Sequence, residues 1–210
     1  MSIKKALSQR LASLYLQGTG LILAGLVMAG LILVGPVAKS AEPPLQGIFA
    51  GNFTLFNPTA PAPTGSFTDL TGSSLTLADY KGKTVLLNFW ATWCAPCIHE
   101  MPSLDALQTR FRGDGLQILA VSLDRGGLGK VVPFKDEMAF ADLDLFLDPK
   151  GKFSREFQVY GLPVTYLIGP DGKMIGSLVG PADWNGPEAE ALIRHYLPNE
   201  AGTSLIKTGG

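Results

Sequence analysis

The fold is decided by residues 84–112, which read TVLLNFWATWCAPCIHEMPSLDALQTRFR. The first seven of these residues are almost continuously apolar, which predicts a strand that is covered on both faces of a sheet. From Ala95 to Arg112, apolar residues return every three or four positions, which is the spacing of one face of a helix. Cys94 and Cys97 therefore lie between a buried strand and the first turn of a helix.

On either side of this segment, apolar runs alternate with helical patterns, which indicates an α/β fold. Gly169-Pro170-Asp171-Gly172 favours an antiparallel hairpin between the two strands that flank it. We expect a central mixed sheet flanked by helices in a domain over residues 67–197, and a flexible tail over 198–210. The further elements are expected as strands at 115–123, 144–147, 164–168 and 174–179, and as helices at 131–138 and 188–197.

The N-terminal part of the 210-residue chain differs from the rest in composition. Residues 11–38 carry no charge and are long enough for one transmembrane helix. Three basic residues lie within residues 1–10, so the positive-inside rule predicts a cytoplasmic N-terminus and a domain on the outer side of the membrane. A cleaved signal sequence is the alternative, since Ala38-Lys39-Ser40 resembles a cleavage site. The proline-rich residues 39–66 are predicted to form a tether between this segment and the domain.

The overall composition excludes several classes of function. The formal net charge is -1, so no basic excess is available to bind the phosphate backbone of a nucleic acid. The chain is 46% hydrophobic, which is too apolar for a disordered protein. Its two cysteines cannot form a dense disulfide framework, so the hydrophobic core must stabilise the domain.

The two cysteines are the residues that predict chemistry. Amide groups at a helix start stabilise a thiolate, so Cys94 is the expected nucleophile. Cys97, one turn into the helix, is expected to attack the resulting mixed disulfide and to release the reduced substrate. Pro96 lies where a missing N–H is harmless, and its rigidity limits the geometry of the ring. A permanent disulfide, or a metal site completed by His99 and His195, is the alternative reading.

The segment from Leu86 to Leu104 resembles the active site of the thioredoxin superfamily. The sequence FWATWCAPC followed by Glu100-Met101-Pro102, the stretch YGLPVTYLIGPDGKMIG from Tyr160 to Gly176, and the apolar N-terminal segment resemble the membrane-anchored TlpA/ResA-like proteins more narrowly. This resemblance implies a thioredoxin-like fold and a thiol-disulfide oxidoreductase.

The resemblance also implies roles for further residues. Pro163 matches the cis-proline that faces the active-site cysteines, and Trp93, Pro96, Leu162 and Pro163 are expected to bind the substrate. Val164 follows Pro163 at a position where threonine or serine is common in the family. This difference is expected to change only the details of how the substrate is contacted.

Glu100 is the expected proton-exchanging group of the site. Thioredoxins of the cytoplasmic type carry a buried aspartate at the position of Asn88, and asparagine cannot accept a proton. Glu100 lies three residues after Cys97 on nearly the same helix face, where a partly buried carboxylate can exchange protons with the thiols. TlpA/ResA-like proteins carry a glutamate there. The alternative is a solvated glutamate that interacts only with the helix dipole.

The expected function is reduction of disulfides in exported proteins through a mixed disulfide, in cytochrome c maturation or in assembly of an oxidase copper site. The expected partners are protein thiols and disulfides, a membrane thiol-transfer electron donor and the lipid bilayer, with no nucleic acid. We expect a monomer that is anchored in a bacterial inner membrane, with its domain in the periplasm. If the N-terminal segment is cleaved, we expect a soluble periplasmic protein instead. No metal or cofactor is expected besides the redox-active Cys94/Cys97 disulfide.

Two alternative functions are a copper-binding metallochaperone that uses the cysteine pair, and an oxidant or isomerase of folding proteins. A peroxidase is not expected, because its signature would require proline at Leu87 and threonine at Ala91.

Overall fold

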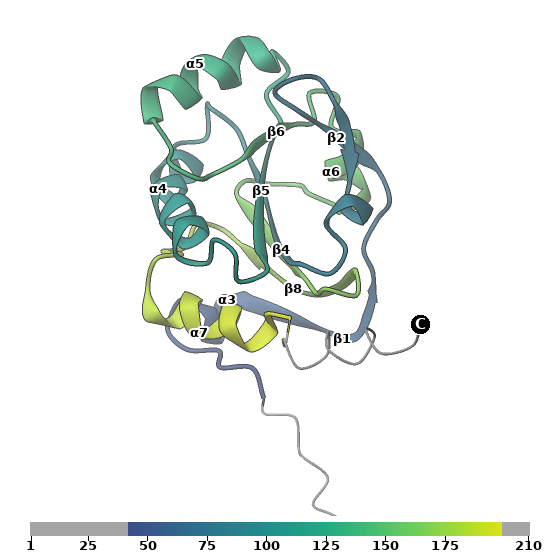
Figure 1. Cartoon of the computed structure of the whole chain (residues 1–210), viewed down its shortest axis with the longest axis vertical. Helices are drawn as coiled ribbons and strands as arrows, with labels where there is room; N and C mark the ends of the chain where they lie inside the picture. Colours follow the sequence, from purple (N-terminus) through teal and green to yellow (C-terminus); the bar gives the residue numbers. More distant parts are fainter. Residues whose placement is uncertain (1–41, 199–210) are drawn as a thin grey trace, which may run out of the picture. The chain divides into compact units, whose positions relative to one another are not determined.

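The structure is a computed structural model, and it describes residues 42–198. Eight strands and the helices around them follow one another along this part of the chain (Figure 1). The elements are α3 (Ile48–Asn52), β1 (Phe53–Pro61), β2 (Ser66–Asp69), β3 (Ser74–Thr76), the short 3-10 helix η1 (Leu77–Tyr80), β4 (Thr84–Trp90), α4 (Ala95–Arg110), β5 (Leu116–Ser122), α5 (Leu128–Met138), β6 (Leu145–Leu147), α6 (Lys152–Glu156), β7 (Val164–Ile168), β8 (Lys173–Val179) and α7 (Pro187–Tyr196).

All eight strands form one mixed sheet in the order β1-β8-β7-β4-β5-β6-β2-β3. Strand β4 is central, because it pairs in parallel with β5 and antiparallel with β7. The register places Val85 opposite Ile168 at one end of β4 and Phe89 opposite Val164 at the other. The segment with Cys94 and Cys97 follows β4 directly, so both cysteines lie at the carboxyl end of a central strand.

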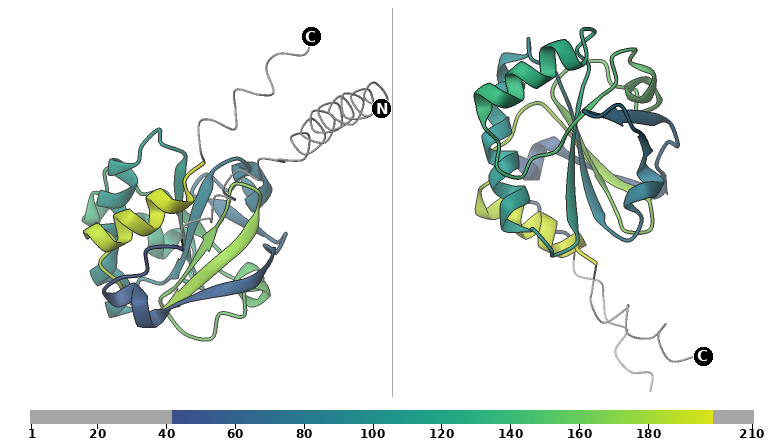
Figure 2. Two further views of the ribbon diagram at one scale, coloured as in Figure 1. Left: turned by 90° about the horizontal axis from the view of Figure 1, so that it is seen from below. Right: turned by 45° about the horizontal axis from the view of Figure 1, so that its top comes forward.

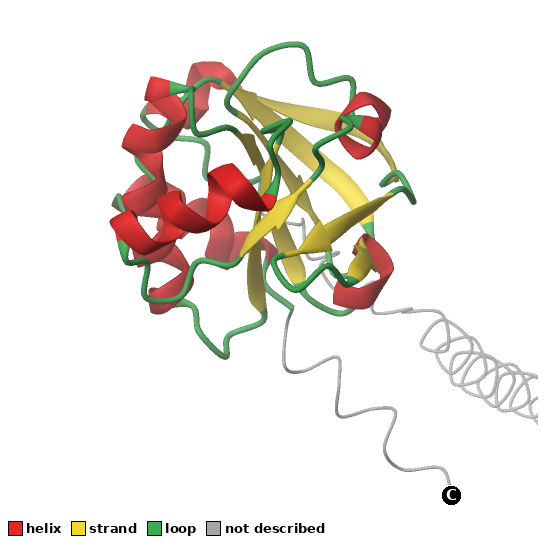
Figure 3. Ribbon diagram, turned by 90° about the horizontal axis from the view of Figure 1, so that it is seen from above, coloured by secondary structure: helices red, strands yellow, loops and turns green. Residues whose placement is uncertain are grey.

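Each face of the sheet is covered by its own hydrophobic cluster. The three long helices α4, α5 and α7 gather on one side together with the short α3 (Figures 2 and 3). These four helices contribute Leu104, Val131, Leu192 and Phe49 to the first cluster. On the opposite side, α6 and η1 cover the sheet: Phe153 of α6 packs against Phe89 of β4, and Tyr80 of η1 packs against Phe67 of β2. This double cover explains why β4 is buried along its whole length.

The central elements agree with the sequence predictions. Strands β4 and β7 have the predicted bounds, and β5, β6 and β8 begin or end within one residue of theirs. Strands β7 and β8 form the predicted antiparallel hairpin. Helix α5 begins at Leu128, three residues earlier than predicted, because Gly127 adopts a positive φ of 52° and starts the helix inside the glycine-rich segment.

The structure differs from the tether that was predicted over residues 39–66. Phe49 and Phe53 are buried in the first hydrophobic cluster, and β1 pairs antiparallel with β8. Strand β2 likewise begins at Ser66, and the compact unit begins at Pro43 instead of residue 67. The proline content suggested a tether, but burial of Phe49 and Phe53 removes their apolar surface from water and attaches this segment to the domain.

The predicted anchor or signal sequence over residues 11–38 lies outside the described residues, and so does the predicted cytoplasmic N-terminus over residues 1–10. The same holds for the predicted tail from residue 199 onward. Within residues 42–198, no helix combines the length and the apolar character that a membrane span needs.

Candidate functional site

Cys94 and Cys97 are joined by a disulfide at the start of α4. Cys94 is the N-cap residue, and its sulfur accepts a hydrogen bond from the backbone N–H of Cys97 at 3.3 Å. This contact is the kind that stabilises a thiolate on the first cysteine after reduction. Cys94 is 6% exposed and Cys97 is fully buried, so Cys94 is the more accessible of the two cysteines.

The loop before Cys94 is fixed by a residue that the sequence did not reveal. Asp124, which follows β5, is buried and accepts hydrogen bonds from the Thr92 N–H at 2.8 Å and the Thr92 hydroxyl at 2.7 Å. The Ser122 hydroxyl donates to the same carboxylate at 2.8 Å. Asp124 thus ties the segment between β4 and α4 to the end of the neighbouring strand. The only sequence signal was an acidic residue directly after a buried strand.

An apolar cavity of about 500 Å³ lies beside Cys94. The exposed side chains of Trp93 (71%) and Tyr160 (93%) are among the residues that line it, together with Pro96 and Leu162. No charged residue lines this cavity. Three of the four predicted substrate-binding residues are therefore brought together here, and Tyr160 is an addition that the sequence analysis quoted only as part of a motif.

Pro163, the fourth predicted substrate-binding residue, follows Leu162 through a cis peptide bond, as the family resemblance implied. Its carbonyl oxygen accepts a hydrogen bond from the Gly180 N–H at 2.9 Å. Pro163 is not among the residues that line the cavity beside Cys94.

Glu100 is buried, and only 2% of its surface is exposed. Its Oε1 accepts a hydrogen bond from Asn88 Nδ2 at 2.8 Å, and its Oε2 accepts one from the Ala182 N–H at 3.1 Å. Burial raises the pKa of Glu100 from 4.5 to about 7, and the bonds from Ala182 and Asn88 oppose this shift. The solvated position considered as an alternative is wrong. A carboxyl group with this pKa can gain and lose a proton near neutral pH.

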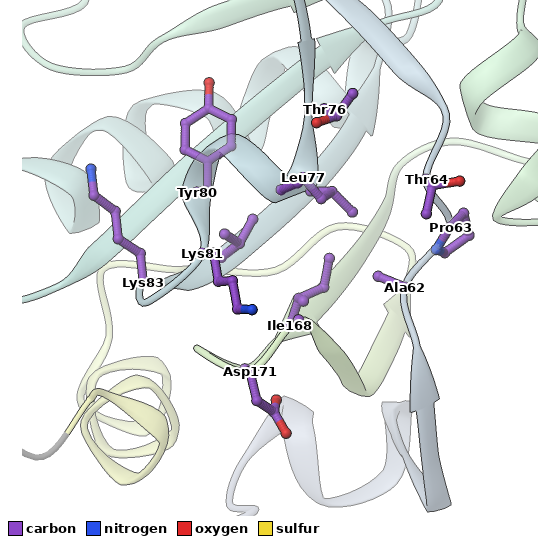
Figure 4. A pocket seen from close by; sticks show the side chains of 14 residues that line it. Ala62, Pro63, Thr64, Thr76, Leu77, Tyr80, Lys81, Lys83, Ile168 and Asp171 are labelled. Atoms are coloured by element: carbon purple, nitrogen blue, oxygen red, sulfur yellow. The ribbon is translucent and has the colours of Figure 1, made fainter. Parts of the chain in front are cut away.

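A separate apolar cavity of about 220 Å³ lies at the opposite end of β4 (Figure 4). Val85 and Ile168 form part of its wall, and the lysines Lys81 and Lys83 also line it. Because β4 runs from Thr84 to Trp90, this cavity and the cysteine pair lie beyond different ends of the strand. None of the residues that line this cavity lines the cavity beside Cys94.

Comparisons with known proteins agree with this geometry. The model of the AhpC/TSA family matches residues 58–176. Thiol-disulfide oxidoreductase ResA of Bacillus thuringiensis subsp. konkukian is 36% identical over 138 residues, which cover 65% of this chain and 74% of that protein. ResA of Bacillus subtilis is 31% identical over 163 residues, which cover 77% of this chain and 82% of that protein.

Among solved structures, a candidate thiol:disulfide interchange protein DsbE of Chlorobium tepidum is similar with a TM-score of 0.55 and 32% identity. The match covers 65% of this chain and 94% of that one. The resemblance inferred from the active-site segment is thereby confirmed. The chain belongs to the AhpC/TSA family, and it is a thiol-disulfide oxidoreductase with a thioredoxin-like fold.

Proposed function

We propose that this enzyme reduces disulfides of exported proteins, with Cys94 as the nucleophile and Cys97 as the resolving thiol. The difference in burial between the two cysteines is the observation that supports this assignment, because only the outer sulfur can meet a second protein. The Cys94 thiolate attacks a substrate disulfide, and a mixed disulfide forms while one substrate thiolate leaves. Cys97 then attacks Cys94, which releases the second substrate thiol and leaves the enzyme disulfide.

Glu100 takes up the proton that Cys97 must lose before it attacks. The two residues are three positions apart on α4, so they lie on nearly the same face of the helix. With a pKa of about 7, the ionised carboxylate is available near neutral pH, and the proton can later pass to solvent or to a product thiol.

The substrates are protein segments with apolar side chains next to a cysteine. This proposal is supported by the uncharged cavity beside Cys94 and by the exposed rings of Trp93 and Tyr160 at its edge. Exported proteins that need free cysteines to bind haem or copper fit this chemistry, so apocytochromes and copper-site precursors are the proposed clients. A membrane thiol-transfer protein supplies two electrons to reduce the enzyme disulfide after each cycle.

Trapping tests the two cysteine roles directly. A Cys97→Ser variant keeps the nucleophile but cannot resolve the mixed disulfide, so it should accumulate covalent adducts with client proteins on non-reducing gels. The matched Cys94→Ser variant should trap none. Equal trapping by both variants would contradict the assignment of nucleophile and resolving thiol.

The direction of electron flow is tested by the midpoint potential of the Cys94/Cys97 couple, measured against glutathione and dithiothreitol buffers. We expect a value near or below about -220 mV, on the reducing side of the range for related enzymes. A value near about -120 mV would make the protein an oxidant of folding proteins.

The role of Glu100 is tested by the pH dependence of Cys97 alkylation in a Cys94→Ser background. Glu100→Gln should remove an inflection near neutral pH. His99→Gln is the matched control, because His99 is an adjacent titratable side chain that lines the same cavity as Glu100. An unchanged profile in the Glu100 variant would rule out the proton exchange.

The location is part of the same proposal: residues 11–38 hold the domain on the periplasmic face of a bacterial inner membrane. Protease treatment of spheroplasts should digest the domain without lysis, and the mass of the mature protein should include the N-terminal segment. A mature protein that begins near residue 40 would instead indicate a cleaved signal sequence.

A further inference from the structure

Asn88 connects Glu100 to a second strand inside the protein. It lies in the middle of β4 and is fully buried. Its Nδ2 atom donates to Glu100 Oε1 at 2.8 Å and to Thr165 Oγ1 at 2.9 Å. Its Oδ1 atom has no hydrogen-bond partner in the part of the chain that the structure describes. A buried acceptor without a partner is uncommon in folded proteins, so this atom needs an explanation.

The arrangement matches the ionised form of Glu100. Both carboxylate oxygens accept hydrogen bonds, one from the Asn88 amide and one from the Ala182 N–H. A protonated Glu100 carries an O–H and requires an acceptor instead. The unpartnered Oδ1 of Asn88 belongs to the same amide group, and a half-turn about the last side-chain bond exchanges the positions of Oδ1 and Nδ2.

We propose that Asn88 is a positioning residue whose amide group turns when Glu100 gains or loses a proton. With Glu100 ionised, Nδ2 donates to the carboxylate and to the Thr165 hydroxyl oxygen, as the structure records. With Glu100 protonated, Oδ1 takes the place of Nδ2 and accepts from the Glu100 O–H. The Thr165 hydroxyl, which can donate as well as accept, then donates to the same Oδ1.

This exchange leaves one amide atom without a partner in each state, and no two donors ever face each other. No covalent bond changes besides the proton on Glu100. The side chain therefore holds the carboxyl group in one place through both halves of the thiol cycle. A leucine at this position would give neither form a partner, and an aspartate would bring a second charge.

The other titratable groups around Glu100 do not provide this support. His99 on α4 and Asp183 in the segment before α7 line the same cavity of about 540 Å³, which reaches Glu100. Neither bonds to the Glu100 carboxylate within the described residues. Cys94 and Cys97 form the disulfide in this state and do not titrate.

The inference rests on the proposed role of Glu100, and nuclear magnetic resonance of the full oxidised chain separates the two. The side-chain carboxyl carbon of Glu100 and the side-chain amide signals of Asn88 are followed from pH 5 to pH 9. As the pH falls, we expect the chemical shifts of the Asn88 side-chain amide protons to move away from the values typical of hydrogen-bonded protons. The midpoint of this change should coincide with the midpoint of the Glu100 titration. In Glu100→Gln, the Asn88 signals should become independent of pH.

The two proposals fail in different ways. If Glu100 titrates while the Asn88 amide protons remain hydrogen-bonded at both ends of the range, the turning amide is overturned. If the Asn88 signals follow the Glu100 titration but the rate of Cys97 alkylation shows no inflection at the same pH, the turning amide is supported. The proposed proton exchange between Glu100 and Cys97 is then overturned instead.

A variant provides a second readout. Asn88→Leu removes both arrangements, and the ionised form loses more because hydrogen bonds to a charged group are stronger. The inflection in Cys97 reactivity should therefore move upward by about one pH unit. Asn185→Leu is the matched control, because Asn185 lines the cavity beside Glu100 but accepts its hydrogen bond from Arg110. The same upward shift in both variants, or none in Asn88→Leu, would contradict the proposal.

Discussion

The free energy of unfolding of the oxidised enzyme should decrease as pH rises, and Glu100 should account for a measurable part of the decrease. Folding raises the pKa of this group from 4.5 to about 7 because the side chain is buried. Between those two pH values the folded state binds more protons at Glu100 than the unfolded state does. The contribution of Glu100 to the free energy of unfolding is therefore complete below about pH 4.5 and is lost as the pH rises to about 7. At about 1.4 kcal/mol per pKa unit, the loss between pH 5 and pH 8 is about 2.5 kcal/mol.

Urea unfolding of the full oxidised chain at pH 5 and pH 8 measures this loss, with Glu100→Gln as the reference. The glutamine side chain is neutral at both pH values, so the variant should not lose this contribution between pH 5 and pH 8. Relative to the wild type, its free energy of unfolding should therefore be higher by about 2.5 kcal/mol at pH 8 than at pH 5. Titration of all other groups cancels in this comparison. A difference that is the same at both pH values would refute the buried, proton-exchanging carboxylate.

Three further substitutions test other parts of the structure. Trp93→Ala should lower kcat/KM for protein disulfides about tenfold, while reduction by dithiothreitol stays unchanged. Asp124→Ala should lower the free energy of unfolding by about 2 kcal/mol, and Asp124→Asn should restore most of it, because an amide can still accept from the Thr92 N–H and donate to the Thr92 hydroxyl. Gly176→Ala should cost about 1 to 3 kcal/mol, because its Cβ would lie 2.5 Å from a backbone oxygen of β1; Gly51→Ala, with open space around it, should cost little. Equal effects at the two glycines would contradict the close approach of β1 to β8.

The sequence predicted the central strands because their signal is local. Strands β4 and β7 are short apolar runs bounded by turns, and α4 shows a helical spacing, so their burial follows from their own residues. The outer strands β1, β2 and β3 lack such a signal. Most residues of β1 are exposed, and the strand forms because its backbone groups pair with those of β8. Because β8 lies more than a hundred residues later in the chain, this pairing leaves no local pattern in the sequence.

The candidate site divides in the same way. Cys94, Cys97 and Glu100 lie within one helix start, so their spacing could be predicted from the sequence. The contribution of Asp124 could not, because its partner Thr92 lies 32 residues earlier and the contact depends on how β5 ends beside β4. The hydrogen bond between Asn88 and Thr165 likewise joins two strands 77 residues apart in sequence.

The prolines that made residues 39–66 resemble a tether have a different consequence at the edge of the sheet. Strand β1 is one of the two edge strands of the sheet, and Pro58 and Pro61 have no backbone N–H to donate to a further strand. Strand β8, next to it, has no such protection. A recombinant domain trimmed to begin at residue 67 would uncover β8, and it would be prone to self-association through that edge, whereas a protein that begins near Pro43 keeps the edge closed.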